Sequence, residues 1–156
     1  MSQAEQRVDL EQSVGYALKR AAAALRTAMD AALRPLELTV PQYACLELLG
    51  QRPRLSNADL ARGAFVTRQS MHGVLLGLRD RGLLTRPTVA AHGRALPTLL
   101  TPTGRKQLAR ASAVVRAVEQ QMLTALPPAR QHRLHDDLAG CAAALAAPRA
   151  GDGERR

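Results

Sequence analysis

The sequence has very few aromatic residues: of its 156 residues two are tyrosine, one is phenylalanine and none is tryptophan. Proteins that bind single-stranded nucleic acid or RNA loops stack the bases on several aromatic side chains. The three rings of this chain, at Tyr16, Tyr43 and Phe65, are too few to form such a surface. We therefore do not expect recognition of single strands or of RNA loops.

Cysteine and long apolar runs are also scarce. The two cysteines, Cys45 and Cys141, lie far apart with no signal peptide ahead of them, which indicates a reducing cytoplasm and no disulfide framework. No apolar run approaches the roughly 20 residues that a membrane-spanning helix needs. The length suffices for about one domain with a real core. The composition thus predicts a cytoplasmic globular protein without a membrane partner.

Signals of enzymatic chemistry are missing as well. The sequence has no Gly-rich phosphate loop, no nucleophile elbow and no paired carboxylates at a useful spacing. His132 and His135, near Cys141, form a weak metal motif, because structural zinc normally has four strong ligands and such a pair is usually a solvated helix face. We expect no enzymatic activity, no cofactor and no metal.

Positive charge is what the chain has in excess, with a formal net charge of +9. Between Arg54 and Arg94 there are seven arginines and two aspartates, a net charge of +5 in this segment. Such a surface attracts polyanions. A membrane surface is the less favoured partner, because the arginines do not line one amphipathic helix opposite bulky aromatic residues. The distribution of charge favours nucleic acid.

The first of two short helices in this basic segment has a clear start signal. Ser56 and Asp59 form the pattern S-x-x-D of a capping box, and Leu55 and Leu60 stand where a hydrophobic staple would. The spacing predicts that the helix begins at Asn57.

The second helix has both a start and a stop signal. Thr67 is its predicted cap, and Gly82 follows a basic last turn as a left-handed stop, so we expect a helix over Arg68–Arg81. The connection before it, Ala64–Val66, is short enough to force the two helices to cross sharply. This arrangement predicts a helix-turn-helix.

The faces of the second helix follow from the 3.6-residue period. Met71, Val74, Leu75 and Leu78 form the predicted buried stripe. The opposite polar surface has side chains that match base edges in the major groove, and Gly73 lets the helix approach closely. The alternative for each residue is an ordinary solvated position. The candidate reading residues are Arg68, Gln69, Ser70, His72 and Gly73.

An alternating segment follows Gly82 and predicts a small hairpin. Its arms are Leu84–Thr88 and Leu96–Leu100, joined by a loop over Ala90–Ala95. Arg94 near the tip suits the minor groove or a phosphate, with an unpartnered loop arginine as the alternative, and Arg86 adds charge to the first arm. Helix, turn, helix and hairpin in this order indicate a winged helix-turn-helix that binds duplex DNA.

Longer helices are predicted on both sides of this segment. They cover about Leu10–Leu36 and Pro41–Gly50, the latter with a capping box at Thr39. A third stretch runs from Pro102 to Leu126, with Thr101 as its cap and a near seven-residue apolar repeat, and a final helix follows Pro127. The apolar seams at the ends of the chain predict a homodimer body, with an intramolecular bundle as the alternative.

The fold class that we expect is mainly α, of the α+β kind, with a small β-wing: six helices and a short hairpin. The predicted segments are the N-terminal helix at 1–36, the winged helix-turn-helix at 37–101, the C-terminal helices at 102–147 and a disordered tail at 148–156. The first and third segments would form the dimer body.

The sequence resembles the MarR (multiple antibiotic resistance regulator) family. The resemblance covers about Leu36–Lys106 and lies in the text LTVPQYACLELLGQRPRLSNADLARGAFVTRQSMHGVLLGLRDRGLLTRP and then HGRALPTLLTPTGRK. It implies a prokaryotic homodimeric regulator, usually a repressor, that binds a pseudo-palindromic operator. Members commonly release DNA on binding small phenolic or other anionic compounds, or on cysteine oxidation.

The resemblance also implies roles for individual residues. Thr67 to Gly73 would enter the major groove, and Arg94 would be the arginine of the wing. The family often has an aspartate two residues before this arginine, where this chain has His92. We therefore hypothesise that His92 makes DNA binding sensitive to pH, and that unchanged affinity between pH 6 and 8 in a His92→Ala comparison would contradict this.

Candidates for regulation are fewer. A small-molecule effector would bind where the dimer body meets the helix-turn-helix, with Tyr43 as an aromatic wall and Arg26 as an anion partner; the alternatives are a staple residue and a surface charge. Cys45 is expected to be a buried core residue, with a redox switch as the alternative. The favoured function is a ligand-released repressor; the others are a thiol-responsive repressor through Cys45, a non-specific architectural DNA binder, and a dimeric adaptor that has lost DNA binding.

Overall fold

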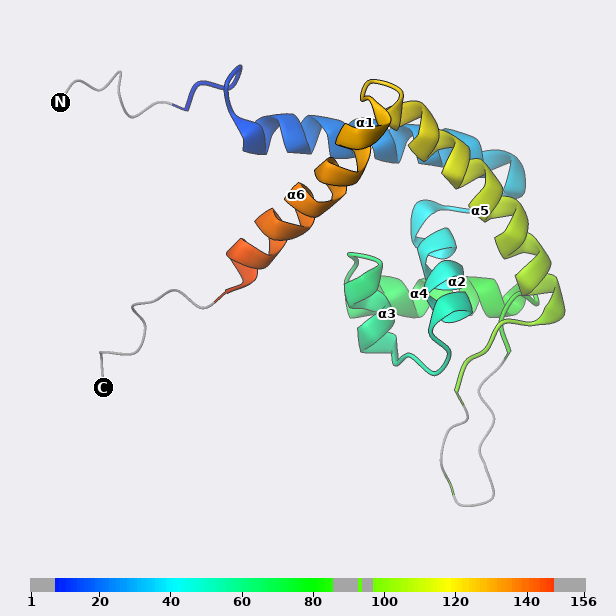
Figure 1. Ribbon diagram of the computed structural model, residues 1–156. Coiled ribbons are helices and arrows are strands. Elements are labelled where there is room, and N and C mark those ends of the chain that lie inside the picture. Colours follow the sequence, from blue (N-terminus) through cyan, green and yellow to red (C-terminus); the bar gives the residue numbers. More distant parts are fainter. Residues whose placement is uncertain (1–7, 86–92, 94–96, 148–156) are drawn as a thin grey trace, which may run out of the picture. The chain divides into compact units, whose positions relative to one another are not determined.

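The computed structural model describes residues 8–85, 93 and 97–147 and divides into two compact units, residues 1–119 and residues 120–156 (Figure 1). We describe each unit by itself. In the described part of the chain the elements are α1 (Val14–Leu33), the 3-10 helix η2 (Arg34–Leu36), α2 (Val40–Gln51), α3 (Asn57–Gly63), α4 (Arg68–Asp80), α5 (Pro102–Leu123) and α6 (Pro128–Ala146).

Helix α1 is shorter than the predicted Leu10–Leu36. It begins at Val14 because the side chain of Ser13 accepts a hydrogen bond from the Tyr16 amide at 3.2 Å, which caps the helix four residues later than expected. Its regular part ends at Leu33, and the next three residues form η2 around Pro35, whose nitrogen has no proton for the α-helical ladder. The prediction was thus wrong at both ends.

The capping signals of the central helices are confirmed. At α2 the Thr39 hydroxyl accepts from the Gln42 amide at 3.2 Å, and the Gln42 side chain accepts from the Thr39 amide at 3.0 Å. Helix α3 begins at Asn57 with the reciprocal box of Ser56 and Asp59. These side chains satisfy amides that have no partner within a helix. Local chemistry therefore fixes where both helices start.

The hydrophobic core of the first unit lies among α2, α3 and α4, which pack on one another, while α1 packs on α2. The stripe predicted for α4 is confirmed at Met71, Leu75 and Leu78, which are buried, and Val74 is half-buried at its edge. The buried core residues are Leu33, Leu38, Cys45, Leu46, Leu49, Leu60, Ala61, Met71, Leu75, Leu78, Leu83, Leu84, Leu100 and Ala111.

Helices α3 and α4 end with the same hydrogen-bonded motif. After α4 the amide of Gly82 donates to the Arg79 carbonyl and that of Leu83 to the Leu78 carbonyl, both at 3.0 Å, and Gly82 has a φ of 71°. After α3 the residue in the glycine position is Phe65, with a φ of 57°. The left-handed conformation costs a residue other than glycine about 1–2 kcal/mol. The turn between α3 and α4 therefore carries strain that the end of α4 does not.

Only the base of the predicted hairpin falls in the described residues. Leu84 and Leu100 form an antiparallel bridge, and the Thr85 amide donates to the Leu99 carbonyl at 2.8 Å. No regular strand continues from this bridge in residues 8–85 or 97–147, where Pro97 has no amide proton to donate to a ladder. The remainder of both arms, with residues 86–92 and 94–96, lies outside the described residues, so the wing stays a prediction.

Helix α5 is seated directly on this base. Thr101 is its cap, as predicted, because its hydroxyl oxygen accepts from the Gly104 amide at 3.0 Å. Gly104 is buried, and a β-carbon built on it would lie 2.0 Å from the carbonyl oxygen of Leu83. Glycine is therefore required at this position for the helix to approach the backbone so closely.

In the second unit, residues 120–147 form the end of α5 and all of α6. The Gln131 side chain donates to the carbonyls of Leu123 and Leu126 at 3.1 and 3.0 Å and satisfies the end of α5. No described residue of α6 is buried; Leu138 is 42% and Leu145 is 89% exposed. Among the described residues no helix is long and apolar enough to cross a membrane.

Candidate nucleic-acid interface

The N-terminal turn of α4 presents an exposed polar surface. The Thr67 hydroxyl oxygen accepts from the Ser70 amide at 3.0 Å, and its proton is donated to the Ser70 hydroxyl oxygen, also at 3.0 Å. The Ser70 hydroxyl proton remains available to an outside acceptor. The cap thus fixes the helix start and still leaves one donor on the outer surface.

The other candidate reading residues of α4 are all exposed. Arg68, Gln69 and His72 lie on the outer face of the helix, opposite the buried stripe of Met71 and Leu75. A β-carbon added at Gly73 would meet no atom within 4 Å, so packing inside the described chain gives no reason for a glycine there. An outside surface that approaches the helix closely gives such a reason.

Two exposed hydrophobic residues near this surface were not among the predicted site residues. Leu76, one helical turn after His72, is 46% exposed, and Phe65, in the turn before α4, is 96% exposed. The spacing of Leu76 from His72 was a usable signal. The exposure of Phe65 could not be predicted from the sequence, because a short turn has no periodicity that distinguishes buried from exposed positions.

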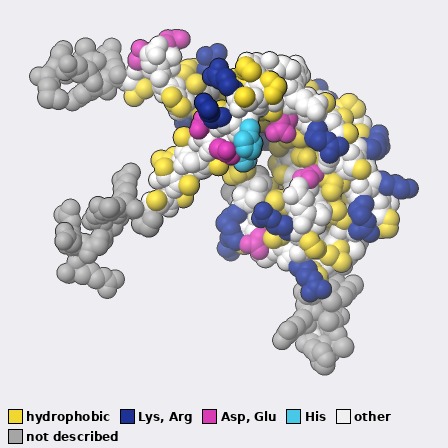
Figure 2. All heavy atoms as spheres, in the orientation of Figure 1, with side chains coloured by type: hydrophobic (Ala, Val, Ile, Leu, Met, Phe, Trp, Pro, Cys, Tyr) yellow, Lys and Arg dark blue, Asp and Glu magenta, His cyan; other side chains and the backbone are white. Residues whose placement is uncertain are grey.

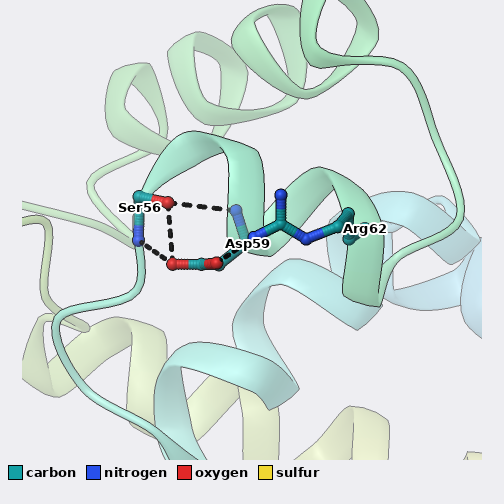
Figure 3. Close-up of polar contacts among 3 residues, drawn as sticks. All are labelled: Ser56, Asp59 and Arg62. Atoms are coloured by element: carbon teal, nitrogen blue, oxygen red, sulfur yellow. Dashed lines mark hydrogen bonds and ion pairs between the residues drawn. The ribbon is translucent and has the colours of Figure 1, made fainter.

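A small polar cluster caps the start of helix α3 (Figure 3). Asp59 accepts hydrogen bonds from the Ser56 amide at 3.2 Å and the Ser56 hydroxyl at 2.7 Å, and it also pairs with Arg62. The hydrogen bonds from Ser56, followed by the nearby Arg62 charge, hold the pKa of Asp59 below its usual value. The ion pair with Asp59 partly neutralises the charge of Arg62 within α3, although the Arg62 side chain remains 69% exposed.

Two arginines of the basic segment serve the fold. Arg79 Nη2 donates to the Thr98 hydroxyl oxygen at 2.7 Å, which ties the end of α4 to the returning arm of the hairpin. Arg79 Nε is buried without a hydrogen-bond partner in the described residues. Arg81 Nη1 donates to the Glu37 carbonyl at 2.6 Å. Both guanidinium groups keep their positive charge, but each is already engaged in a hydrogen bond within the fold.

On the face shown in Figure 2, the first unit carries many Lys and Arg side chains and fewer Asp and Glu side chains, as the charge count predicts. Arg86, His92 and Arg94 lie outside the described residues, so their roles remain predictions. Gly93 between them is described; it is exposed and has a φ of 76°, a conformation typical of turns.

The two effector candidates have separate surroundings. Arg26 pairs with Asp30 of its own helix at 4.0 Å, and its side chain is 63% exposed. Tyr43 is half-buried, donates its hydroxyl proton to Glu47 at 3.2 Å and has its pKa raised by burial. No contact that the structure describes joins Arg26 to Tyr43.

Glu47 is the centre of a polar cluster that connects α2 to α5. It accepts hydrogen bonds from Ser112 at 2.7 Å, from Gln51 at 2.6 Å and from Tyr43. Burial opposes ionisation, but these hydrogen bonds and the Arg116 charge outweigh it and keep the pKa of Glu47 below its usual value. The carboxylate therefore stays ionised at neutral pH.

An open cavity of about 660 Å³ lies beside this cluster, between the end of α2, the base of the hairpin and α5. Its walls come from segments far apart in the chain, so the residues that line it could not be predicted from the sequence. Both signs of charge and apolar side chains line it. Its walls include Glu47, Thr85, Leu99, Arg105, Leu108 and Ser112.

Cys45 is completely buried in the core, as its position predicted. Burial raises the pKa of its thiol to about 12, although the Arg79 charge acts in the opposite direction. The thiolate is the reactive form of cysteine. With this pKa the Cys45 thiol stays protonated at neutral pH, and its burial keeps it away from solvent. This environment argues against the redox alternative. The second cysteine, Cys141, is exposed on α6.

Comparison with known proteins agrees with this geometry. The model of the MarR family matches residues 36–95. The HTH-type transcriptional repressor Rv2887 of Mycobacterium tuberculosis is 48% identical over 118 residues, which are 76% of this chain and 85% of the relative.

Solved structures of the M. tuberculosis MarR family protein Rv2887 are similar in fold. The structure of its complex with DNA has a TM-score of 0.70 and 43% identity, covering 83% of this chain and 97% of that chain. The structure of its complex with salicylic acid has a TM-score of 0.72 and 44% identity, covering 83% and 96%. This chain therefore belongs to the MarR family and is a DNA-binding transcriptional repressor, not an enzyme.

Proposed function

We propose that the protein binds a pseudo-palindromic operator as a homodimer in the cytoplasm and that a small anionic aromatic ligand releases it. The observation that carries the DNA-binding part is the capped N-terminal turn of α4, whose polar side chains Gln69 and His72 are exposed while Met71 is buried. The related protein Rv2887 has been solved in complex with DNA. In the proposed complex, residues Thr67 to Gly73 enter the major groove, and Arg86, His92 and Arg94 contact the flanking backbone and minor groove.

Support for a homodimer comes from the helices at the two ends of the chain. In α6 no described residue is buried, and in the first half of α1 Val14 is 78% and Leu18 is 47% exposed. Exposed apolar side chains along a helix are unfavourable in water, and a continuous face of them is normally covered by another chain or element. We assign residues 1–36 and 102–147 to a dimer body, which places two helix-turn-helix segments on one DNA duplex.

Support for a ligand comes from the chemistry of the first unit and from the relative. Rv2887 has been solved in complex with salicylic acid, an aromatic carboxylate. In this chain the cavity beside Glu47 offers Arg105 to an anionic group and Leu99 and Leu108 to a ring. Tyr43, which is hydrogen-bonded to Glu47, and Arg26 on α1 remain the other candidates. We propose that a ligand of this class binds the DNA-free form more tightly and thereby releases the operator.

The first experiment is selection of duplexes from a randomised pool by the full-length protein, followed by affinity measurement over a salt series. A repressor should enrich one inverted-repeat sequence and bind it roughly 10³-fold or more tightly than a scrambled duplex. Gln69→Ala should reduce that preference, whereas Arg110→Ala, an exposed arginine on α5, should leave it unchanged. Equal affinity for all duplexes with the same salt slope would instead establish a non-specific architectural protein.

The second experiment titrates salicylic acid into the complex of the protein with its selected duplex. The proposal predicts that salicylic acid releases the DNA. If the ligand binds in the cavity, the concentration needed for release should be higher for Arg105→Ala than for the wild type. If it binds at the other candidates, that concentration should be higher for Tyr43→Phe and Arg26→Ala. If salicylic acid leaves the complex intact and does not raise the melting temperature of the free protein, this ligand class is excluded.

A further inference from the structure

The side chain of Phe65 combines two unfavourable features. It is 96% exposed, and its φ of 57° lies in a region where a bulky residue is rare. Within residues 57–75, all of which the structure describes, no other large hydrophobic side chain is exposed. The fold gains no core packing from this ring, so its presence needs another explanation.

The backbone of the turn does not require a phenylalanine either. The Phe65 amide donates to the Arg62 carbonyl at 3.3 Å and the Val66 amide donates to the Ala61 carbonyl at 3.0 Å, the same pair of bonds that ends α4 at Gly82. At Gly82 the chain uses glycine, which adopts this conformation without steric cost. The same motif therefore occurs twice in this chain, with glycine in the left-handed position after α4 and phenylalanine in that position before α4.

We propose that the ring of Phe65 makes an apolar contact with the operator duplex, on a thymine methyl group or on a deoxyribose at the edge of the major groove. Phe65 precedes the cap of α4, Thr67, by two residues. In a helix-turn-helix the first helix crosses the DNA backbone and the start of the second enters the groove, so the turn between them lies near the groove edge. The inference rests on the proposed function, because it places this turn on the same DNA.

The surroundings of the ring favour DNA over a protein partner. Close to Phe65 in the chain, the side chain of Arg62 is 69% exposed, and Thr67 and Arg68 are exposed as well. Protein interfaces usually have an apolar core of several residues and few charges at the centre. An exposed ring beside two exposed arginines fits a polyanion that also has apolar surface, and phenylalanine is a known partner of the thymine methyl group.

The experiment uses the full-length protein and the duplex that the wild type selects from a randomised pool. The variants Phe65→Gly and Phe65→Asn remove the ring and accept the left-handed backbone, whereas Phe65→Tyr keeps the ring and the strain. We expect the first two to melt at or above the temperature of the wild type and to bind about tenfold more weakly, as for loss of one partly buried aromatic side chain. Phe65→Tyr should bind like the wild type. The salt slope should not change, because no phosphate contact is lost.

A second set of duplexes, in which single thymines are replaced by uracil, distinguishes the two DNA surfaces. If one replacement weakens the wild type and leaves Phe65→Gly unaffected, the ring contacts that methyl group. If no replacement separates the two proteins while the tenfold loss persists, the contact is to deoxyribose. Either result supports the proposal.

Two results would overturn it. Phe65→Gly that binds the selected duplex as tightly as the wild type excludes the contact. A change in oligomeric state of Phe65→Gly, measured by sedimentation, would assign the ring to a subunit interface. Failure of the wild type to enrich any duplex is a different outcome, because it refutes the proposed function before any Phe65 variant is compared.

Discussion

Gly73 gives the sharpest test of how α4 meets DNA, because the same methyl group should have opposite effects on folding and on binding. A β-carbon at this exposed position meets no atom of the described residues within 4 Å, so Gly73→Ala fits this part of the fold. Replacing glycine by alanine in the interior of a helix stabilises it by about 1 kcal/mol. For a chain of this size that raises the melting temperature by about 2–4 °C. If α4 approaches the bases through Gly73, the methyl group overpacks the interface by about 1–3 kcal/mol, a loss of roughly 5- to 150-fold in affinity.

Gly77 is the matched control on the same helix. A β-carbon there would lie 3.8 Å from the Gln42 side-chain nitrogen, an ordinary contact on the half-buried side of α4. Gly77→Ala should therefore gain similar stability without losing affinity. Melting by circular dichroism and binding of the selected duplex by fluorescence anisotropy measure both effects. Gly73→Ala that is more stable and binds as tightly as the wild type would refute a close approach of α4 to the groove at this residue.

Three further predictions concern the parts that hold this surface in place. Gly104→Ala should lower the free energy of unfolding, measured by urea titration, by about 3 kcal/mol or more, because its methyl group would lie 2.0 Å from the Leu83 carbonyl oxygen. This would place it among the most destabilising single changes. A decrease below about 1 kcal/mol would contradict the packing described. Thr98→Val should cost about 1–3 kcal/mol by leaving Arg79 without its acceptor, and Thr98→Ser should retain the stability of the wild type; equal losses in both would show that the hydroxyl is not needed. The pKa of Glu47 is lowered from 4.5 in the folded protein, so its ionised form contributes stability that is fully present above pH 4.5 and is lost as the pH falls through the lower pKa of the folded state. Glu47→Gln should therefore lose less stability on acidification than the wild type. Parallel stability profiles of the two proteins against pH would refute this.

The boundaries set by local chemistry could be predicted from the sequence. Thr39, Ser56, Thr67 and Thr101 are all caps in the structure, because a capping side chain bonds to an amide three residues away and needs no knowledge of the rest of the fold. The start of α1 was missed for a related reason. Its apolar spacing continues back to Leu10, whereas the Ser13 cap decides the boundary.

Interactions between distant segments could not be predicted in the same way. Arg79 and Arg81 were counted as cations for DNA, yet their partners are Thr98 and Glu37, 19 and 44 residues away in the chain. The cavity beside Glu47 likewise has walls from α2, the hairpin base and α5. Period and composition describe one segment at a time, so they predict which helix faces DNA but not the contacts that position it.

Those distant contacts also explain how a ligand beside α5 would act on α4. Helix α5 is bonded to the rest of the first unit through Gln107, which donates to the Leu36 carbonyl at 2.8 Å, and through Ser112 on Glu47. At its start, Thr101 donates to the Gly82 carbonyl at 2.6 Å, directly after the end of α4. With Gly104 against the Leu83 backbone, the first turn of α5 has no room to shift without moving the segment that follows α4. In the proposed mechanism a ligand in the cavity would touch α2 and α5 together, so a difference in affinity between two positions of α5 would be sufficient to change the placement of α4 on DNA.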